Sequence, residues 1–123
     1  MNDEDLTLEN LTILIREFIQ ERGWEGFQKP SSLAVSAAIE LGELLERFQW
    51  LTHEEIDNLL RSEEYRKSIA DEMADVIIYM LRLADTTGIE PTKAILEKLE
   101  KNKSKYPANK WRGRIPDKVR NPR

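Results

Sequence analysis

Two pairs of carboxylates interrupt apolar stretches of the sequence: Glu40 with Glu43, and Glu72 with Asp75. Residues three apart on a helix project from one face about one turn apart. Burying such acids is costly unless something neutralises them, and a bound cation is the natural compensation. If the two helices lie antiparallel, the four carboxylates converge. An all-oxygen set of this kind predicts a site for a hard cation, Mg²⁺ or Mn²⁺.

A solvated acidic face is the alternative reading of these pairs. Acid pairs at this spacing are common on helix surfaces, and Arg47, four residues after Glu43, could be a surface ion-pair partner. Two pairs among Leu, Ile, Val and Ala favour the metal site. Glu46 lies to one side of the Glu40–Glu43 face, where it is either a general base or a surface charge.

A stripe of donors is predicted in the last helix, where Lys98, Asn102 and Lys105 follow at steps of four and three. Lysine and asparagine on one face would suit phosphates, and solvated lysines are the alternative.

Three aromatic residues could serve a site or a core. Tyr79 follows Asp75 by four residues and therefore shares the acidic face. Trp24 and Trp50 fall in loops or at helix ends, where they would pack at a core edge or stack on a nucleobase.

These residues must be positioned by helices, because apolar residues recur at steps of three and four and no segment alternates long enough to be a strand. Ser31 or Ser32 would cap the second helix, and Thr52 with Glu55 has capping-box spacing. Long helices with short connections pack as antiparallel neighbours, so we predict an all-α antiparallel bundle of about four main helices plus a short one. The expected helices cover residues 7–22, 31–50, 52–60, 62–87 and 91–106.

Composition narrows the class of protein. The 123 residues fit one domain, and the absence of cysteine with a single histidine excludes thiolate and di-histidine metal sites. A net charge of -4 argues against a nucleic-acid partner. The N-terminus lacks a signal-peptide pattern and no apolar run approaches the length of a membrane span, so we expect a cytoplasmic protein with no membrane partner.

The charge is unevenly distributed along the chain. Residues 107–123 hold six Lys or Arg and one acid, a net charge of +5. We therefore expect a helical domain over 1–106 and a basic tail over 107–123, either without fixed structure or folded over an anion or a neighbouring subunit. Amphipathic helices in so short a chain leave apolar faces uncovered, which predicts a homo-oligomer, a dimer or a tetramer.

Four blocks of this sequence resemble successive motifs of the all-alpha nucleoside triphosphate pyrophosphohydrolases, the MazG-like superfamily. The similarity is closest to its dCTP pyrophosphatase branch. Beyond the Glu-x-x-Glu and Glu-x-x-Asp pairs, it includes Gly23-Trp24, Glu46-Arg47-Phe48-Gln49-Trp50 and Tyr106-Pro107. The four blocks occupy residues 21–27, 40–50, 71–79 and 102–107.

The resemblance implies cleavage of a nucleoside triphosphate to the monophosphate and pyrophosphate. It implies that Glu40, Glu43, Glu72 and Asp75 hold Mg²⁺. Trp24, Trp50 and Tyr79 would border the base and sugar, and Lys98, Asn102, Lys105 and Tyr106 would bind phosphates or order the last helix.

The reaction expected from the acids is attack by a water on the triphosphate, with Glu43 or Glu46 as the base. The dCTP enzymes carry a histidine in the first helix that this sequence lacks. An alternative is therefore the same fold acting on dUTP or a modified nucleotide. A non-catalytic helical oligomer that binds a protein partner is the alternative from another class.

Overall fold

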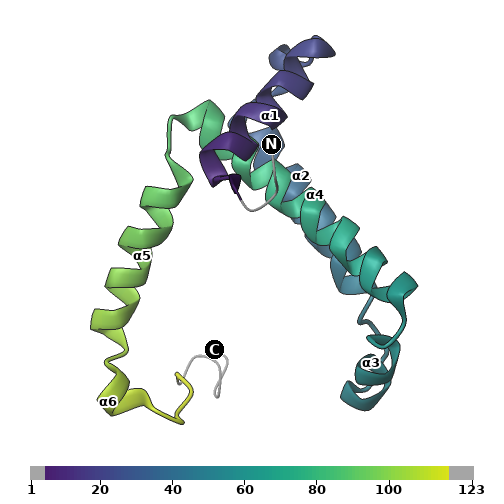
Figure 1. Cartoon of the computed structure of the whole chain (residues 1–123), viewed down its shortest axis with the longest axis vertical. Helices are drawn as coiled ribbons and strands as arrows, with labels where there is room; N and C mark the ends of the chain where they lie inside the picture. Colours follow the sequence, from purple (N-terminus) through teal and green to yellow (C-terminus); the bar gives the residue numbers. More distant parts are fainter. Residues whose placement is uncertain (1–4, 117–123) are drawn as a thin grey trace. The chain divides into compact units, whose positions relative to one another are not determined.

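The computed structural model describes residues 5–116, and every regular element among them is helical (Figure 1). The all-α prediction is therefore confirmed for this part of the chain. No helix within residues 5–116 is long and apolar enough to span a membrane. The elements are α1 (Leu8–Glu21), the 3-10 turn η2 (Glu25–Phe27), α2 (Pro30–Glu46), α3 (His53–Leu59), α4 (Glu63–Thr87), α5 (Pro91–Lys105) and α6 (Ala108–Trp111).

Several helix ends follow the capping signals of the sequence. Thr52 and Glu55 form the predicted capping box, with both hydrogen bonds at 3.1 Å. Ser62 accepts from the Tyr65 amide at the start of α4, and Gly88 ends that helix with φ +72°, a left-handed conformation that glycine adopts without strain.

Both ends of α2 differ from the prediction. The helix starts at Pro30 with Lys29 as N-cap, so the assignment of Ser31 or Ser32 as the cap was wrong. Proline suits this place because its φ is already helical and its missing N–H is not needed in the first turn. The helix also stops at Glu46 instead of continuing to Trp50, whose backbone is left-handed with φ +66° and cannot continue a right-handed helix.

The chain divides into two compact units, Met1–Pro91 and Thr92–Arg123. This structural division lies earlier than the change of composition at residue 107. The first part of the predicted tail forms the short helix α6, and residues 117–123 lie outside the described residues.

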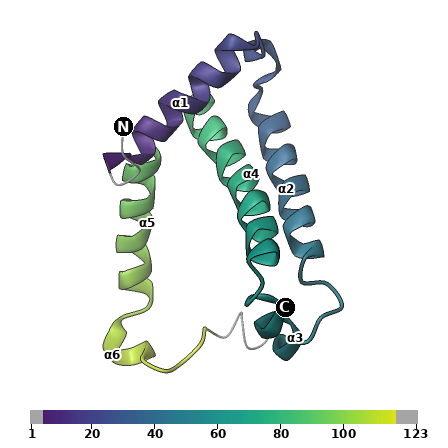
Figure 2. The same ribbon diagram turned by 45° about the vertical axis from the view of Figure 1, so that its right-hand side comes forward.

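In the first unit, α2 and α4 run side by side and antiparallel (Figures 1 and 2). Near the start of α2, Gln28 Oε1 accepts from Arg82 Nε at 2.9 Å. Near its end, Arg47 donates to Glu72 Oε1 at 3.1 Å, and its carbonyl accepts from the Tyr65 hydroxyl at 2.6 Å. These cross-links fix the register in which residues early in one helix face residues late in the other.

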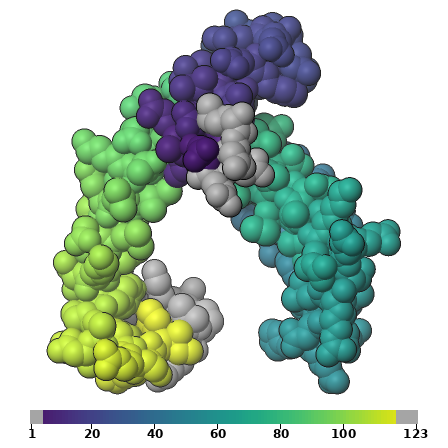
Figure 3. All heavy atoms as spheres, viewed as in Figure 1, coloured from purple at the N-terminus to yellow at the C-terminus, as the bar shows by residue number. Residues whose placement is uncertain are grey.

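The buried core lies at one end of this helix pair, where α1 also packs on α4. Its apolar members are Ile19, Leu33, Ala37 and Leu81. The other end, from residue 38 of α2 and up to residue 80 of α4, has no buried side chain. On the face shown in Figure 3, side chains of α4 are therefore exposed to solvent.

A charged network fastens α1 to α4 beside the core. Asp85 accepts from Arg16 Nε at 3.0 Å and Nη2 at 2.6 Å, and from Arg82 Nη1 at 2.6 Å. The hydrogen bond from Arg16 holds the pKa of Asp85 below its usual value despite partial burial. Because the Arg82 side chain is only 6% exposed, its charge depends on Asp85 for compensation.

Candidate metal centre

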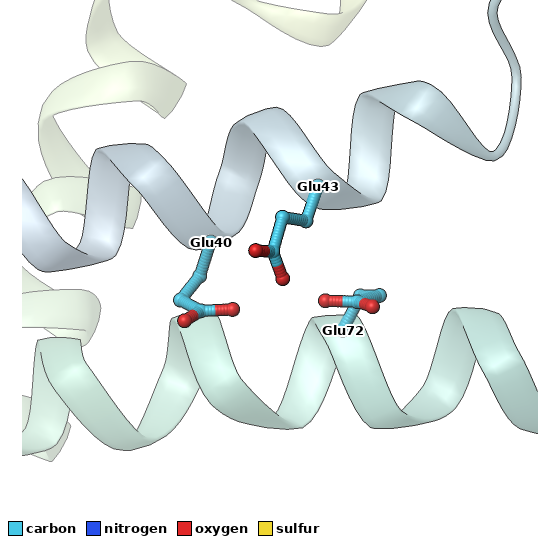
Figure 4. A group of neighbouring side chains, drawn as sticks. All are labelled: Glu40, Glu43 and Glu72. Carbon is cyan, nitrogen blue, oxygen red and sulfur yellow. The ribbon is translucent and has the colours of Figure 1, made fainter.

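Three carboxylates meet between α2 and α4, where Glu40, Glu43 and Glu72 point toward one another (Figure 4). Each offers an oxygen, and these oxygens all lie within 4.8 Å of one another. We call this group the carboxylate cluster. It exists because the spacing of three puts Glu40 and Glu43 on one face of α2, and the antiparallel register brings Glu72 opposite them.

Glu72 is the most enclosed member of the carboxylate cluster. Its side chain is 13% exposed, and its Oε1 accepts from Arg47. Its Oε2 is inaccessible to solvent and has no hydrogen-bond partner among the described residues. A buried acceptor left without a donor costs about 1–3 kcal/mol or more. A hard cation among these oxygens would remove that cost, so the residues present fit a Mg²⁺ or Mn²⁺ site.

Repulsion within the cluster perturbs the titration of Glu43. The pKa of Glu43 is raised, mainly by the charge of Glu40, then by a carboxyl–carboxyl hydrogen bond to Glu40 and by the charge of Glu72. The exposed Glu43 carboxylate thus holds a proton more readily than an isolated glutamate. The same crowding of negative charge favours the binding of a divalent cation, because the cation offsets the repulsion between the carboxylates.

The fourth predicted ligand, Asp75, lies outside this cluster. It is exposed on α4, one turn after Glu72. Glu46, the last residue of α2, is also exposed and lies one turn after Glu43. The structure therefore brings together three of the four predicted ligands, and roles for Asp75 and Glu46 stay predictions.

Arg47 also belongs to the site, which the sequence pattern did not predict. It pairs with Glu72 on the opposite helix, and not with Glu43 as the alternative of a solvated acidic face suggested. Arg47 is the C-cap residue of α2, and from there its side chain reaches across to α4. The guanidinium supplies one positive charge at the edge of the carboxylate cluster.

The two predicted tryptophans lie at opposite ends of α2. Trp24 precedes the helix and packs edge-to-face on Phe18 with ring centroids 5.9 Å apart. Trp50 follows the helix and is 91% exposed. At about 1.5 Å per residue, the length of α2 separates its two ends by about 25 Å. Tyr79 is half-buried on α4, two turns after Glu72.

The predicted phosphate stripe belongs to the second unit and is divided between two cavities. Lys98 and Asn102 line a cavity of about 280 Å³ on α5, with the apolar residues Ala94, Ile95 and Leu99. Lys105 lines a different cavity at the end of α5, and the adjacent Tyr106 packs on Trp111. All three residues belong to α5 at steps of four and three, so they share one face of that helix, and their role in binding phosphates stays a prediction.

Over the described residues, these observations define a helical protein with a carboxylate cluster between two antiparallel helices. Residues 35–114 match the model of the MazG-like family, and the chain belongs to that family. The resemblance found in the sequence blocks is thereby confirmed.

Known relatives carry pyrophosphatase names. The chain is 36% identical over 107 residues to dCTP pyrophosphatase 1 of Bos taurus and 38% identical over 103 residues to that of Homo sapiens. These matches cover 87% and 84% of this chain, and 63% and 61% of the relatives. The chain thus spans less than two thirds of the length of these curated relatives. A crystal structure of a pyrophosphatase from Archaeoglobus fulgidus has a TM-score of 0.74 and 41% identity, covering 87% of this chain and 98% of that one.

Proposed function

We propose that this chain is a Mg²⁺-dependent nucleoside triphosphate pyrophosphohydrolase, which releases the monophosphate and pyrophosphate. The observation that carries the proposal is the carboxylate cluster with its unsatisfied, buried Glu72 oxygen. Membership of the MazG-like family and the names of the dCTP pyrophosphatase relatives support the same reaction.

The chemistry follows from charge. A nucleoside triphosphate carries about four negative charges near neutral pH, and an acidic cluster alone would repel it. Mg²⁺ held by Glu40, Glu43 and Glu72 would screen this charge and stabilise the departing pyrophosphate. Glu43 or Glu46 would orient a water and accept its proton.

The aromatic residues suggest how the base is held. Trp50 is almost fully exposed on a left-handed backbone, an arrangement that costs energy and that no packing among residues 5–116 offsets. Stacking on a nucleobase would cover that ring. We propose dCTP as the substrate, with dUTP or a modified nucleotide as the alternative that a substrate panel would reveal.

A second copy of the chain is part of the proposal. Large apolar side chains along α2 and α4 remain exposed, and one chain cannot bring Trp24 and Trp50 to one pocket because α2 separates them. A partner copy would cover the apolar face and could supply the second tryptophan. The exposed residues include Val35, Ile39, Leu41, Leu45, Met73, Ile77, Ile78 and Met80.

Light scattering is expected to give the mass of a dimer or a tetramer. Ile39→Glu and Ile77→Glu should dissociate this assembly, because a charge would enter an apolar interface. The matched variant Leu60→Glu changes an apolar residue beyond α3 and should keep the assembly. A wild-type mass equal to one chain would refute the prediction.

The reaction is tested by incubating the protein with Mg²⁺ and each common ribo- and deoxynucleoside triphosphate, then separating the products by ion exchange. Monophosphate plus pyrophosphate from one or a few substrates is the expected result. Release of orthophosphate would contradict the proposal. Failure to cleave the common and modified triphosphates with either Mg²⁺ or Mn²⁺ would favour the non-catalytic oligomer.

Metal binding should be visible without substrate. Mg²⁺ is expected to raise the melting temperature, because a ligand that binds only the native state stabilises it, by about 2.7 kcal/mol at a hundredfold excess over Kd. Glu40→Gln should lose most of this shift, whereas Glu17→Gln on α1 should retain it. An equal shift in both variants would place the metal elsewhere.

A further inference from the structure

Arg47 connects α2 and α4 both through its backbone and through its side chain. It is the C-cap residue of α2, and its Nη2 donates to Glu72 Oε1 on α4 at 3.1 Å. We propose that Arg47 is a positioning residue for the carboxylate cluster, which holds Glu72 by one oxygen and so presents its other oxygen to a divalent cation. This role rests on the metal site of the proposed function.

The two carboxylate oxygens of Glu72 have different environments. Oε1 accepts from Arg47, whereas Oε2 is inaccessible to solvent and has no hydrogen-bond partner among the described residues. The last torsion of a glutamate side chain is only broadly restricted, so a carboxylate keeps one orientation only when a partner fixes it. Here Arg47 is that partner, and Glu72 points toward Glu40 and Glu43 (Figure 4). The hydrogen bond to Oε1 therefore leaves Oε2 free to bind a cation.

The position of Arg47 is itself fixed by hydrogen bonds of its backbone. Its amide donates to the Leu44 carbonyl at 3.1 Å, and its carbonyl accepts from the Tyr65 hydroxyl at 2.6 Å. Tyr65 lies in the first turn of α4, where its amide donates to Ser62 Oγ at 3.3 Å. Residues seven apart lie on one face of a helix, so Tyr65 and Glu72 share a face of α4. Arg47 thus contacts that face at two points, with its carbonyl and with its guanidinium.

The charge of Arg47 and the orientation that it imposes have opposite consequences for cation binding. A nearby positive charge repels a cation, so removal of the guanidinium would by itself strengthen binding. The Arg47 side chain is 45% exposed, however, and solvent and salt screen the charge of such a group. The orientation of Glu72 is not screened, and partners that orient metal ligands typically contribute about tenfold to a hundredfold to metal affinity. We therefore expect the loss of orientation to outweigh the loss of repulsion.

The test is titration of the full chain with Mn²⁺ in the absence of nucleotide, with the free ion measured by electron paramagnetic resonance. Arg47→Leu removes both the charge and the donors, and it is expected to weaken Mn²⁺ binding at least about tenfold. The spectrum of bound Mn²⁺ should change as well, because one ligand would be reoriented. Arg47→Gln removes the charge but keeps a donor, so it should weaken binding less, and it serves if Arg47→Leu does not fold. Unchanged or tighter binding in the folded variants would overturn the proposal.

The matched control is Arg61→Leu, which makes the same substitution at an exposed position between α3 and α4. Its Mn²⁺ affinity should stay within about twofold of wild type. Equal weakening in this control would indicate a general loss of charge or stability and would overturn the proposal. Tyr65→Phe removes only the hydroxyl that holds the Arg47 carbonyl, and it should weaken binding by a smaller factor than Arg47→Leu.

Glu40→Gln separates this role of Arg47 from the metal site itself. Because Glu40 is a member of the carboxylate cluster, the variant should lose most Mn²⁺ binding whatever Arg47 contributes. Loss of binding in Glu40→Gln with unchanged binding in Arg47→Leu would overturn the positioning role alone. Absence of Mn²⁺ binding by the wild-type chain would overturn both this role and the metal site of the proposed function.

Discussion

Glu72→Gln is expected to lower Mg²⁺-dependent turnover more than about a hundredfold, because even residues that only support metal ligands contribute up to about that much. The substitution keeps the size of the side chain but removes the charge of the most buried member of the carboxylate cluster. It also deprives Arg47 of its ionic partner. Initial rates at saturating substrate over a range of Mg²⁺ concentrations would measure the effect.

The matched control for this experiment is Asp57→Asn, which neutralises an exposed acid of α3. Its turnover should remain within about twofold of wild type. Asp75→Asn extends the comparison to the predicted ligand that lies outside the carboxylate cluster. A folded Glu72→Gln protein with unchanged turnover would show that the cluster is not the site of the reaction.

Asp85→Asn is expected to destabilise the fold by about 2–4 kcal/mol at pH 7, because it leaves the buried Arg82 charge uncompensated. The loss should depend on pH. The pKa of Asp85 is lowered in the folded protein, so its contribution is complete above the unfolded-state pKa of about 3.9 and disappears as pH falls through the lower folded value.

Urea unfolding of wild type and variant at a series of pH values would measure this dependence. The difference in unfolding free energy between them should be largest near neutral pH and should narrow progressively below about pH 5. Asp57→Asn again provides the same chemical change at an exposed position. A difference that stays constant down to pH 3 would mean that the amide disturbs packing instead of removing a charge interaction.

The sequence predicted those features that depend on neighbouring residues. The capping box of Thr52 with Glu55 and the end of α4 at Gly88 are local, and both appear as expected. The end of α2 was harder, because Phe48 and Trp50 continue its apolar pattern. The left-handed turn at Trp50, and not the hydrophobic pattern, decides where that helix stops.

The site required information that local patterns lack. A spacing of three places Glu40 and Glu43 together, but the register between α2 and α4 decides that Glu72, and not Asp75, joins them. The Asp85 network was missed for the same reason. A signal was present, since Arg82 interrupts the apolar stretch 80–83, and a cation there requires a buried partner.

The buried core of the first unit lies at one end of the α2–α4 pair, so local unfolding should cost more free energy at that end than at the other. Amide hydrogens near Leu33, Ala37 and Leu81 should exchange slowly, since exposing them requires separation of three helices. Those around the carboxylate cluster are protected by only two helices and should exchange faster. Cation binding at the carboxylate cluster would hold α2 and α4 together at this less protected end. The site would therefore become ordered when the cation binds.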